Sequence, residues 1–129
     1  MASIFWFRRD LRLADNPALN DAIEATPERE VYPFYALSIQ DFKALAAIRQ
    51  HSIYESLKSL DSSLGGTLSV APEPPAVALL AAAKQLGAKA VFATRAFDPA
   101  GVAEQNSVGE SLAASGIALH LKDSYYAVV

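Results

Sequence analysis

Charged residues near the N-terminus are clustered in a pattern that suits the binding of an anion or a polar ligand. Arg8, Arg9 and Arg12 fall within five residues, and Asp10 lies between them. A guanidinium presents a rigid fork of donors that matches carboxylates and phosphates. The same residues could instead form an ion-pair network in which Asp10 and Asp15 hold the loop in place. We expect a mixture, with one arginine structural and another facing a ligand.

Other residues that could carry chemistry are few. Arg95 and Asp98 lie in a loop after an apolar run, and Arg49 is either an exposed helix charge or a further cation near the same ligand. His51 and His120 are interpreted as structural or solvent-exposed, because no triad-like arrangement surrounds them. The sequence contains no G-x-G-x-x-G fingerprint, no phosphate-binding G-x-x-x-x-G-K-[ST] loop and no G-x-S-x-G elbow.

The composition excludes several classes of protein. Of the 129 residues, 52% are hydrophobic and 19% are charged, which is typical of a folded domain with its own core. The absence of cysteine excludes disulfides and thiolate metal sites. The net charge of −3 disfavours DNA binding by this chain alone. No apolar run approaches the roughly 20 residues of a spanning helix, and no signal peptide is recognisable. We therefore expect a soluble, cytoplasmic domain without membrane contact.

The elements that must position these residues follow from hydrophobic spacing and turn signals. Asn16 can cap a helix that begins at Pro17, where a missing N–H costs nothing. A stripe of aliphatic residues predicts a long helix over 53–64, ended by Gly65-Gly66. Ser38 to Asp41 is predicted to be a loop. The predicted strands cover 3–7, 31–37, 67–70, 90–94 and 117–121, and two further helices cover about 77–86 and 99–115.

This alternation predicts an α/β domain over residues 1–129, with a five-stranded, parallel, doubly wound, Rossmann-like sheet in the order 3-2-1-4-5 and helices on both faces. In that order the first and fourth strands are neighbours at the topological switch point. Ligands of such sheets bind beyond the carboxyl ends of the strands at this point. The loops 8–15 and 95–99 are therefore expected to line one crevice.

The segment from Trp6 to Leu19, WFRRDLRLADNPAL, resembles the opening motif of DNA photolyases and cryptochromes nearly letter for letter. Looser similarity continues along the chain. Residues 49–60 resemble a family helix, residues 86–92 fit the family's fourth strand, and residues 95–99 are similar to its Arg-Glu-Tyr-Glu-Pro loop. The resemblance covers the whole chain but matches only the family's N-terminal α/β domain.

The resemblance implies an antenna site. In this family the α/β domain holds a light-harvesting chromophore, a folate or a deazaflavin, in or near the cleft at the strand ends. Matching positions implicate Arg8, Arg9 and Asp10, with Arg49 for the deazaflavin type. Ala36 to Ser38, at the end of the second strand, would supply wall contacts. These residues are the cofactor-binding candidates that the family implies.

The loop and helix start at 99–105 depart from the family pattern. Val102 and Glu104 stand where arginines are usual, and Gln105 stands where an aspartate is usual. Ala100-Gly101 do not match the Asn-Glu pair of the folate-type members. The departures favour a deazaflavin over a folate as the possible antenna.

The resemblance also implies what this chain lacks. Photolyases repair ultraviolet-induced pyrimidine dimers by light-driven electron transfer from reduced FAD, which binds in a C-terminal helical domain. That domain is absent here, so the chain is expected to have no catalytic residues and no repair activity alone. Trp6 is predicted to be a core residue rather than part of an electron chain.

The C-terminal residues 123–129 end in tyrosines and valines, which suggests that they pack against something further along a longer protein. The missing helical domain would then be the partner of this one, in a protein that is a photolyase. The alternatives are a fragment of a cryptochrome photoreceptor and a standalone nucleotide-binding or interaction module of the same fold.

Overall fold

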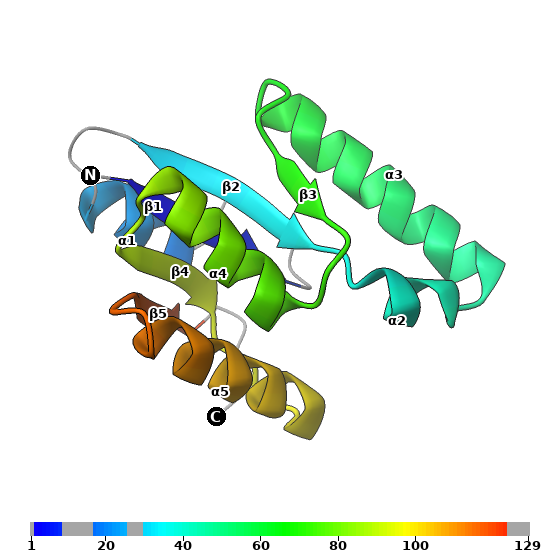
Figure 1. Cartoon of the computed structure of the whole chain (residues 1–129). Coiled ribbons are helices and arrows are strands. Elements are labelled where there is room, and N and C mark those ends of the chain that lie inside the picture. The colour runs from blue at the N-terminus through cyan, green and yellow to red at the C-terminus, as the bar shows by residue number, and fades with distance from the viewer. Residues whose placement is uncertain (1, 9–16, 26–29, 124–129) are drawn as a thin grey trace.

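The computed structural model describes residues 2–8, 17–25 and 30–123. Within these ranges five parallel strands form one sheet in the order β3-β2-β1-β4-β5 (Figure 1). The strands are β1 (Ser3–Phe7), β2 (Val31–Ala36), β3 (Ser69–Ala71), β4 (Ala90–Thr94) and β5 (Ala118–Lys122). The helices are α1 (Pro17–Ala25), α2 (Ile39–Lys43), α3 (Ala47–Ser63), α4 (Pro75–Leu86) and α5 (Pro99–Ala113). The predicted fold class and strand order are confirmed.

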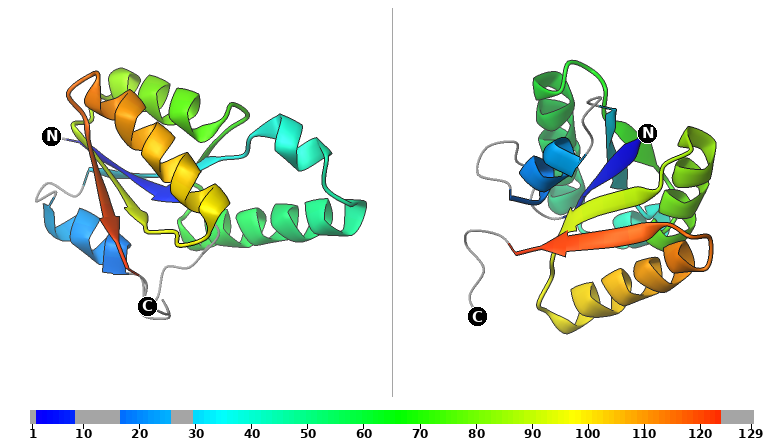
Figure 2. Two further views of the ribbon diagram at one scale, coloured as in Figure 1. Left: turned by 90° about the horizontal axis from the view of Figure 1, so that it is seen from below. Right: turned by 90° about the vertical axis from the view of Figure 1, so that its left-hand side faces the viewer.

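β1 is the central strand, and its five residues are all buried. Its side chains alternate between two cores, because successive residues of a strand point to opposite faces. Ile4 and Trp6 join a core formed with α4 and α5, whereas Phe5 and Phe7 join a core formed with α1 and Leu60 of α3. Figure 2 shows these helices on opposite sides of the sheet. The unbroken apolar run of β1 is thus explained by burial on both faces.

The long helix α3 begins at Ala47, six residues before the predicted start, and its predicted aliphatic stripe reaches the core only at the C-terminal end. Leu60 is buried and Leu64, just after the helix, packs against the same core. The N-terminal half extends away from the sheet, with Ile48 79% exposed (Figure 1). Gln50 anchors this end, since its side-chain amide donates to the carbonyl oxygens of Phe42 and Leu45, at 3.1 and 3.0 Å. Within the described ranges, none of the helices has both the length and the apolar character needed to cross a bilayer.

Other predicted boundaries are also wrong. Ile39 to Asp41 was expected in a loop but forms the first part of α2, a helix of only five residues whose length is too short to show a helical repeat. The start of the third strand shifts from Thr67 to Ser69, because the Thr67 hydroxyl donates to the carbonyl oxygen of Leu64 and belongs to the turn after α3.

Along the edge strand β5, exposed residues alternate with half-buried ones. His120 lies on its exposed side, and its ring stacks on Phe92 of β4 at a centroid distance of 4.8 Å. The structural interpretation of this histidine therefore agrees with its contacts.

Candidate functional site

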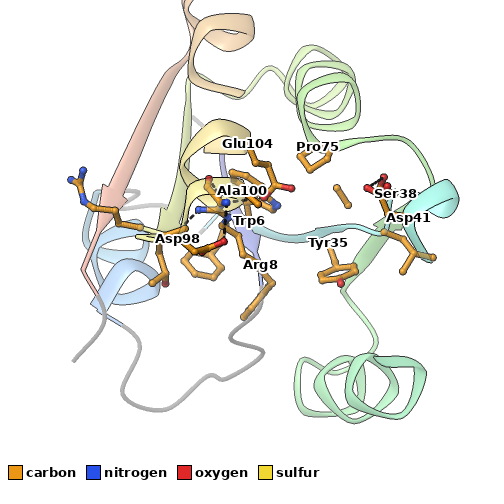
Figure 3. A pocket seen from close by; sticks show the side chains of 17 residues that line it. Trp6, Arg8, Tyr35, Ser38, Asp41, Pro75, Asp98, Ala100 and Glu104 are labelled. Carbon is orange, nitrogen blue, oxygen red and sulfur yellow. Dashed lines mark hydrogen bonds and ion pairs between the residues drawn. The ribbon is translucent and has the colours of Figure 1, made fainter. Parts of the chain in front are cut away.

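A cavity of about 360 Å³ lies beyond the carboxyl ends of β1, β2 and β4, at the predicted switch point (Figure 3). We call it the strand-end cavity. Its walls come from the ends of these three strands, the start of α2, the first residue of α4, and the loop and first turns of α5, at 94–104. Its volume falls at the lower end of the range of small-molecule sites, which is roughly 300–1,000 Å³.

Arg8 follows β1 directly and joins it to the start of α5. Its Nη1 donates to the carbonyl oxygen of Thr94 at 3.3 Å and to Oε1 of Gln105 at 2.8 Å. Its Nη2 donates to the carbonyl oxygen of Gly101 and to Oε1 of Glu104, both at 2.9 Å. A guanidinium carries four N–H donors on these two nitrogens, and all four are used. Arg8 therefore acts as a structural clamp on one wall of the strand-end cavity.

The guanidinium of the clamp is largely shielded from water. The Arg8 side chain is only 9% exposed, and its guanidinium carbon lies 4.6 Å from the centre of a Trp6 ring. A cation above an aromatic face gains electrostatic stabilisation from the ring quadrupole. Trp6 is itself 2% exposed, so it is a core residue as predicted.

Gln105 is one of two buried polar residues among the described ones. Its side-chain amide contacts both Arg8 and the β4–α5 loop. Its Oε1 accepts from Arg8 and from the backbone N–H of Ala96 at 2.9 Å. Its Nε2 donates to the carbonyl oxygen of Ala96 at 3.3 Å. An aspartate at this position would have no amide donor for that carbonyl. Gln105 therefore holds both the Arg8 guanidinium and the β4–α5 loop in place.

The first turn of α5 closes the same wall. Asp98 caps the helix, because its Oδ2 accepts from the backbone N–H of Gly101 at 3.1 Å. A Cβ atom at Gly101 would lie 2.5 Å from the Cβ of Ala96 and 2.8 Å from Oδ1 of Asp98. Glycine is therefore required by the close approach of the loop to the helix.

Tyr35, Ser38 and Asp41 line the opposite wall from Arg8 and Glu104 (Figure 3). Burial raises the pKa of the Tyr35 phenol above its usual value, and the negative charge of Glu104 raises it further. The phenol is therefore neutral at physiological pH and remains a hydrogen-bond donor.

Ser38 adopts a left-handed backbone conformation with φ of 50° at the start of α2. Its hydroxyl donates to Oδ2 of Asp41 at 2.9 Å. A non-glycine residue in this region is uncommon and is often found where a site constrains the backbone. The turn places both polar side chains on the cavity wall.

The structure brings three of the six predicted site residues together. Arg8, Ala36 and Ser38 line the strand-end cavity. Arg49 is an exposed residue of α3 and is not part of the lining. Arg9 and Asp10 lie outside the described residues. The cofactor-binding role of all six residues stays a prediction.

Three residues of the site were missed or treated only as departures from a pattern. Tyr35 reads as one more apolar strand residue in the sequence, although its position at the end of a central strand could have indicated it. Glu104 and Gln105 lie a turn inside a helix, more than ninety positions from Arg8. Nothing in their local sequence signals that contact.

Comparison with known proteins shows which family this chain resembles. The model of the DNA photolyase family matches residues 3–129. Cryptochrome-1 of Arabidopsis thaliana is 35% identical over 121 residues, which cover 91% of this chain and 18% of the relative. The deoxyribodipyrimidine photo-lyase of Agrobacterium fabrum is 33% identical over 117 residues, which cover 88% of this chain and 24% of the relative.

Solved structures show the same fold. A class III photolyase from Agrobacterium tumefaciens superposes with a TM-score of 0.77 at 29% identity, over 95% of this chain and 25% of that one. A photolyase from Sulfolobus tokodaii, described as having two FAD molecules and as implying a novel light-harvesting cofactor, gives a TM-score of 0.81 at 22% identity, over 95% of this chain and 29% of that one. The chain thus spans between 18% and 29% of the length of each of these relatives.

Proposed function

The chain belongs to the DNA photolyase family, and we propose that it is the light-harvesting domain, with an antenna chromophore bound in the strand-end cavity. Its relatives include both photolyases and cryptochromes. A chromophore bound here would absorb light and pass the excitation energy to a flavin elsewhere in the full-length protein.

The observation that carries this proposal is the form of the strand-end cavity. It lies at the switch point of the sheet, where ligands of doubly wound folds bind. One wall is held rigid by the Arg8 clamp, and the other offers the Tyr35 ring and the hydroxyl of Ser38. A preformed cavity with a few fixed polar groups is typical of a cofactor site.

The residues present fit a ring-shaped chromophore. Tyr35 is partly buried and offers an aromatic surface to a planar ring, while Ala36 leaves space beside it. Ser38 supplies a hydroxyl that can donate or accept, and the Tyr35 phenol stays protonated. These residues would bind and orient the chromophore and keep water from its face. We favour a deazaflavin over a folate.

The whole protein, by this proposal, performs light-dependent DNA repair through an FAD-binding helical domain that pairs with this one. This chain would supply no catalytic residue, and its contribution would be light collection. Repair activity would then require the second domain.

The test is a titration of the purified chain with a deazaflavin and with a folate, followed by chromophore absorbance and fluorescence. We expect saturable binding of the deazaflavin. The variant A100W should abolish it, because residue 100 lines the cavity and is exposed in the first turn of α5. A103W is the matched control, since Ala103 is exposed on the same helix and is not part of the lining. Equal binding by both variants, or no binding of either chromophore, contradicts the proposal.

A further inference from the structure

The positive charge on the described walls of the strand-end cavity is already engaged. Two arginines line it, Arg8 and Arg95. Every N–H on the terminal nitrogens of Arg8 donates within the clamp, and one of its acceptors is the carboxylate of Glu104. Nε of Arg95 donates to Oδ1 of Asp123 at 3.0 Å, in an exposed ion pair. Both guanidinium charges on the described walls are therefore balanced by carboxylates, so a phosphate entering the cavity would meet no uncompensated arginine among the described residues.

Among the described lining residues the carboxylates outnumber the guanidiniums, with Asp41, Asp98 and Glu104 against Arg8 and Arg95. Glu104 lies on the α5 side with its side chain 43% exposed, and Asp41 is exposed on the α2 side. The two carboxylates come from elements that follow different strands, so a ligand in the cavity would lie between them (Figure 3). A carboxylate accepts hydrogen bonds but cannot donate any. Ring N–H groups and hydroxyls suit such walls, whereas phosphate oxygens do not.

The field of Glu104 reaches across the cavity. Its charge raises the pKa of the Tyr35 phenol, which lines the facing wall. An anion placed between the two residues would be repelled by the same charge, because like charges repel with an energy set by their size and separation.

We propose that the strand-end cavity selects an uncharged, N–H-bearing ring ligand over its phosphate-bearing counterpart, and that Glu104 sets this preference. The inference rests on the proposed function, in that the cavity binds a ring-shaped chromophore. It adds the charge class of that chromophore and names the residue that determines it.

A matched pair of flavins tests the selectivity. Riboflavin and flavin mononucleotide share one ring system and differ by a terminal phosphate. Titration of each into the purified chain, followed by quenching of flavin fluorescence, should show tighter binding of riboflavin by about three- to tenfold at low salt. The difference should shrink as salt screens the repulsion.

The variant E104Q tests the residue. It keeps an oxygen acceptor for Arg8 but removes one negative charge, so binding of flavin mononucleotide should tighten by about three- to tenfold relative to that of riboflavin. E110Q makes the same change on an exposed residue further along α5, outside the lining, and should alter neither affinity. Circular dichroism would confirm that both variants are folded.

Three outcomes overturn the inference. They are tighter binding of flavin mononucleotide than of riboflavin by the wild type, an affinity ratio that E104Q leaves unchanged, and an equal shift in E110Q. If neither flavin binds while the deazaflavin does, this inference fails and the proposed function stands. If no chromophore binds at all, both fail.

Discussion

At the scale of single residues, the structure decides between the two roles that the sequence left open for Arg8, ligand binding and structural contact. The cluster of arginines suggested anion binding, but the Arg8 guanidinium donates to two backbone carbonyls and two side chains of the protein itself. Arg8 contributes to the site indirectly, because it holds in place the cavity wall that contains Gly101 and Glu104. A positioning role of this kind depends on the planar fork of arginine and not on charge alone.

Replacement of Arg8 by lysine should therefore destabilise the domain even though the charge is kept. A lysine ammonium has three donors and no fork, so at least one of the four acceptors loses its partner. We expect a loss of about 1–3 kcal/mol in the free energy of unfolding, measured by urea denaturation. R49K is the matched control, because Arg49 is exposed and a surface change of this kind costs about 0.5 kcal/mol or less. Equal stability of the two variants would contradict the clamp.

Tyr35 gives a prediction on pH. Its pKa in the folded domain is raised above the usual 10.0, first by burial and then by Glu104. The folded state therefore holds the phenolic proton when the unfolded state has lost it, and stability falls as pH rises above that usual value. Urea denaturation at pH 8 and at pH values above 10 should show a smaller loss of stability in Y35F than in wild type. If the free energies of unfolding of the two proteins change with pH in the same way, the raised pKa of Tyr35 does not cause the loss of stability.

At the scale of elements, the β4–α5 junction is the part that shapes the site. Asp98 caps the helix, Gln105 ties its second turn back to the loop, and Gly101 permits the close approach between them. The carbonyl oxygen of Gly101 is also an acceptor of Arg8. The junction is thus ordered by helix capping and by a contact with a distant strand at the same time.

Gly101→Ala should disturb this junction. The added Cβ would lie 2.5 Å from that of Ala96, so the loop or the helix must shift. We expect a destabilisation of about 1–3 kcal/mol by thermal or urea unfolding. Gly109→Ala on the same helix is the control, and we expect it to stabilise the domain rather than destabilise it. Its Cβ would meet Leu119 at an ordinary 3.7 Å, and alanine favours a helix interior over glycine by about 0.5–1 kcal/mol. A neutral Gly101→Ala would show that the junction is looser than described.

The helices and strands also show which parts of the fold can be predicted from the sequence. Four consecutive apolar residues in β1, Ile4 to Phe7, and the regular alternation of segments were enough to predict the central strand and the sheet order. The one-turn helix α2 was missed because hydrophobic spacing needs more than one turn to appear. The partners of Arg8 were missed because they are set by the meeting of two segments almost a hundred residues apart. The cavity position followed from topology, whereas its charge followed from contacts that topology does not specify.

At the scale of the whole molecule, the charge of −3 argues against tight contact with DNA by this chain alone. Non-specific DNA binding depends on cations that displace counterions from the phosphates. Fluorescence anisotropy with a labelled duplex at about 150 mM salt, near the physiological value, should show no saturable binding at micromolar protein. Tight, salt-dependent binding would contradict this expectation and would point to a basic surface on the chain.

The long reach of Arg8 has a consequence for the order in which the domain forms. β1 is made first on the ribosome, yet its neighbour β4 and all four acceptors of Arg8 lie beyond residue 89. Until that later stretch emerges, the apolar first strand can pair on one edge only, with β2. A nascent chain interrupted before β4 would carry the buried surface of Trp6 and Ile4 without α5 to cover it. Such exposed strands are prone to aggregate, so we expect the early chain to depend on chaperones more than its small size suggests.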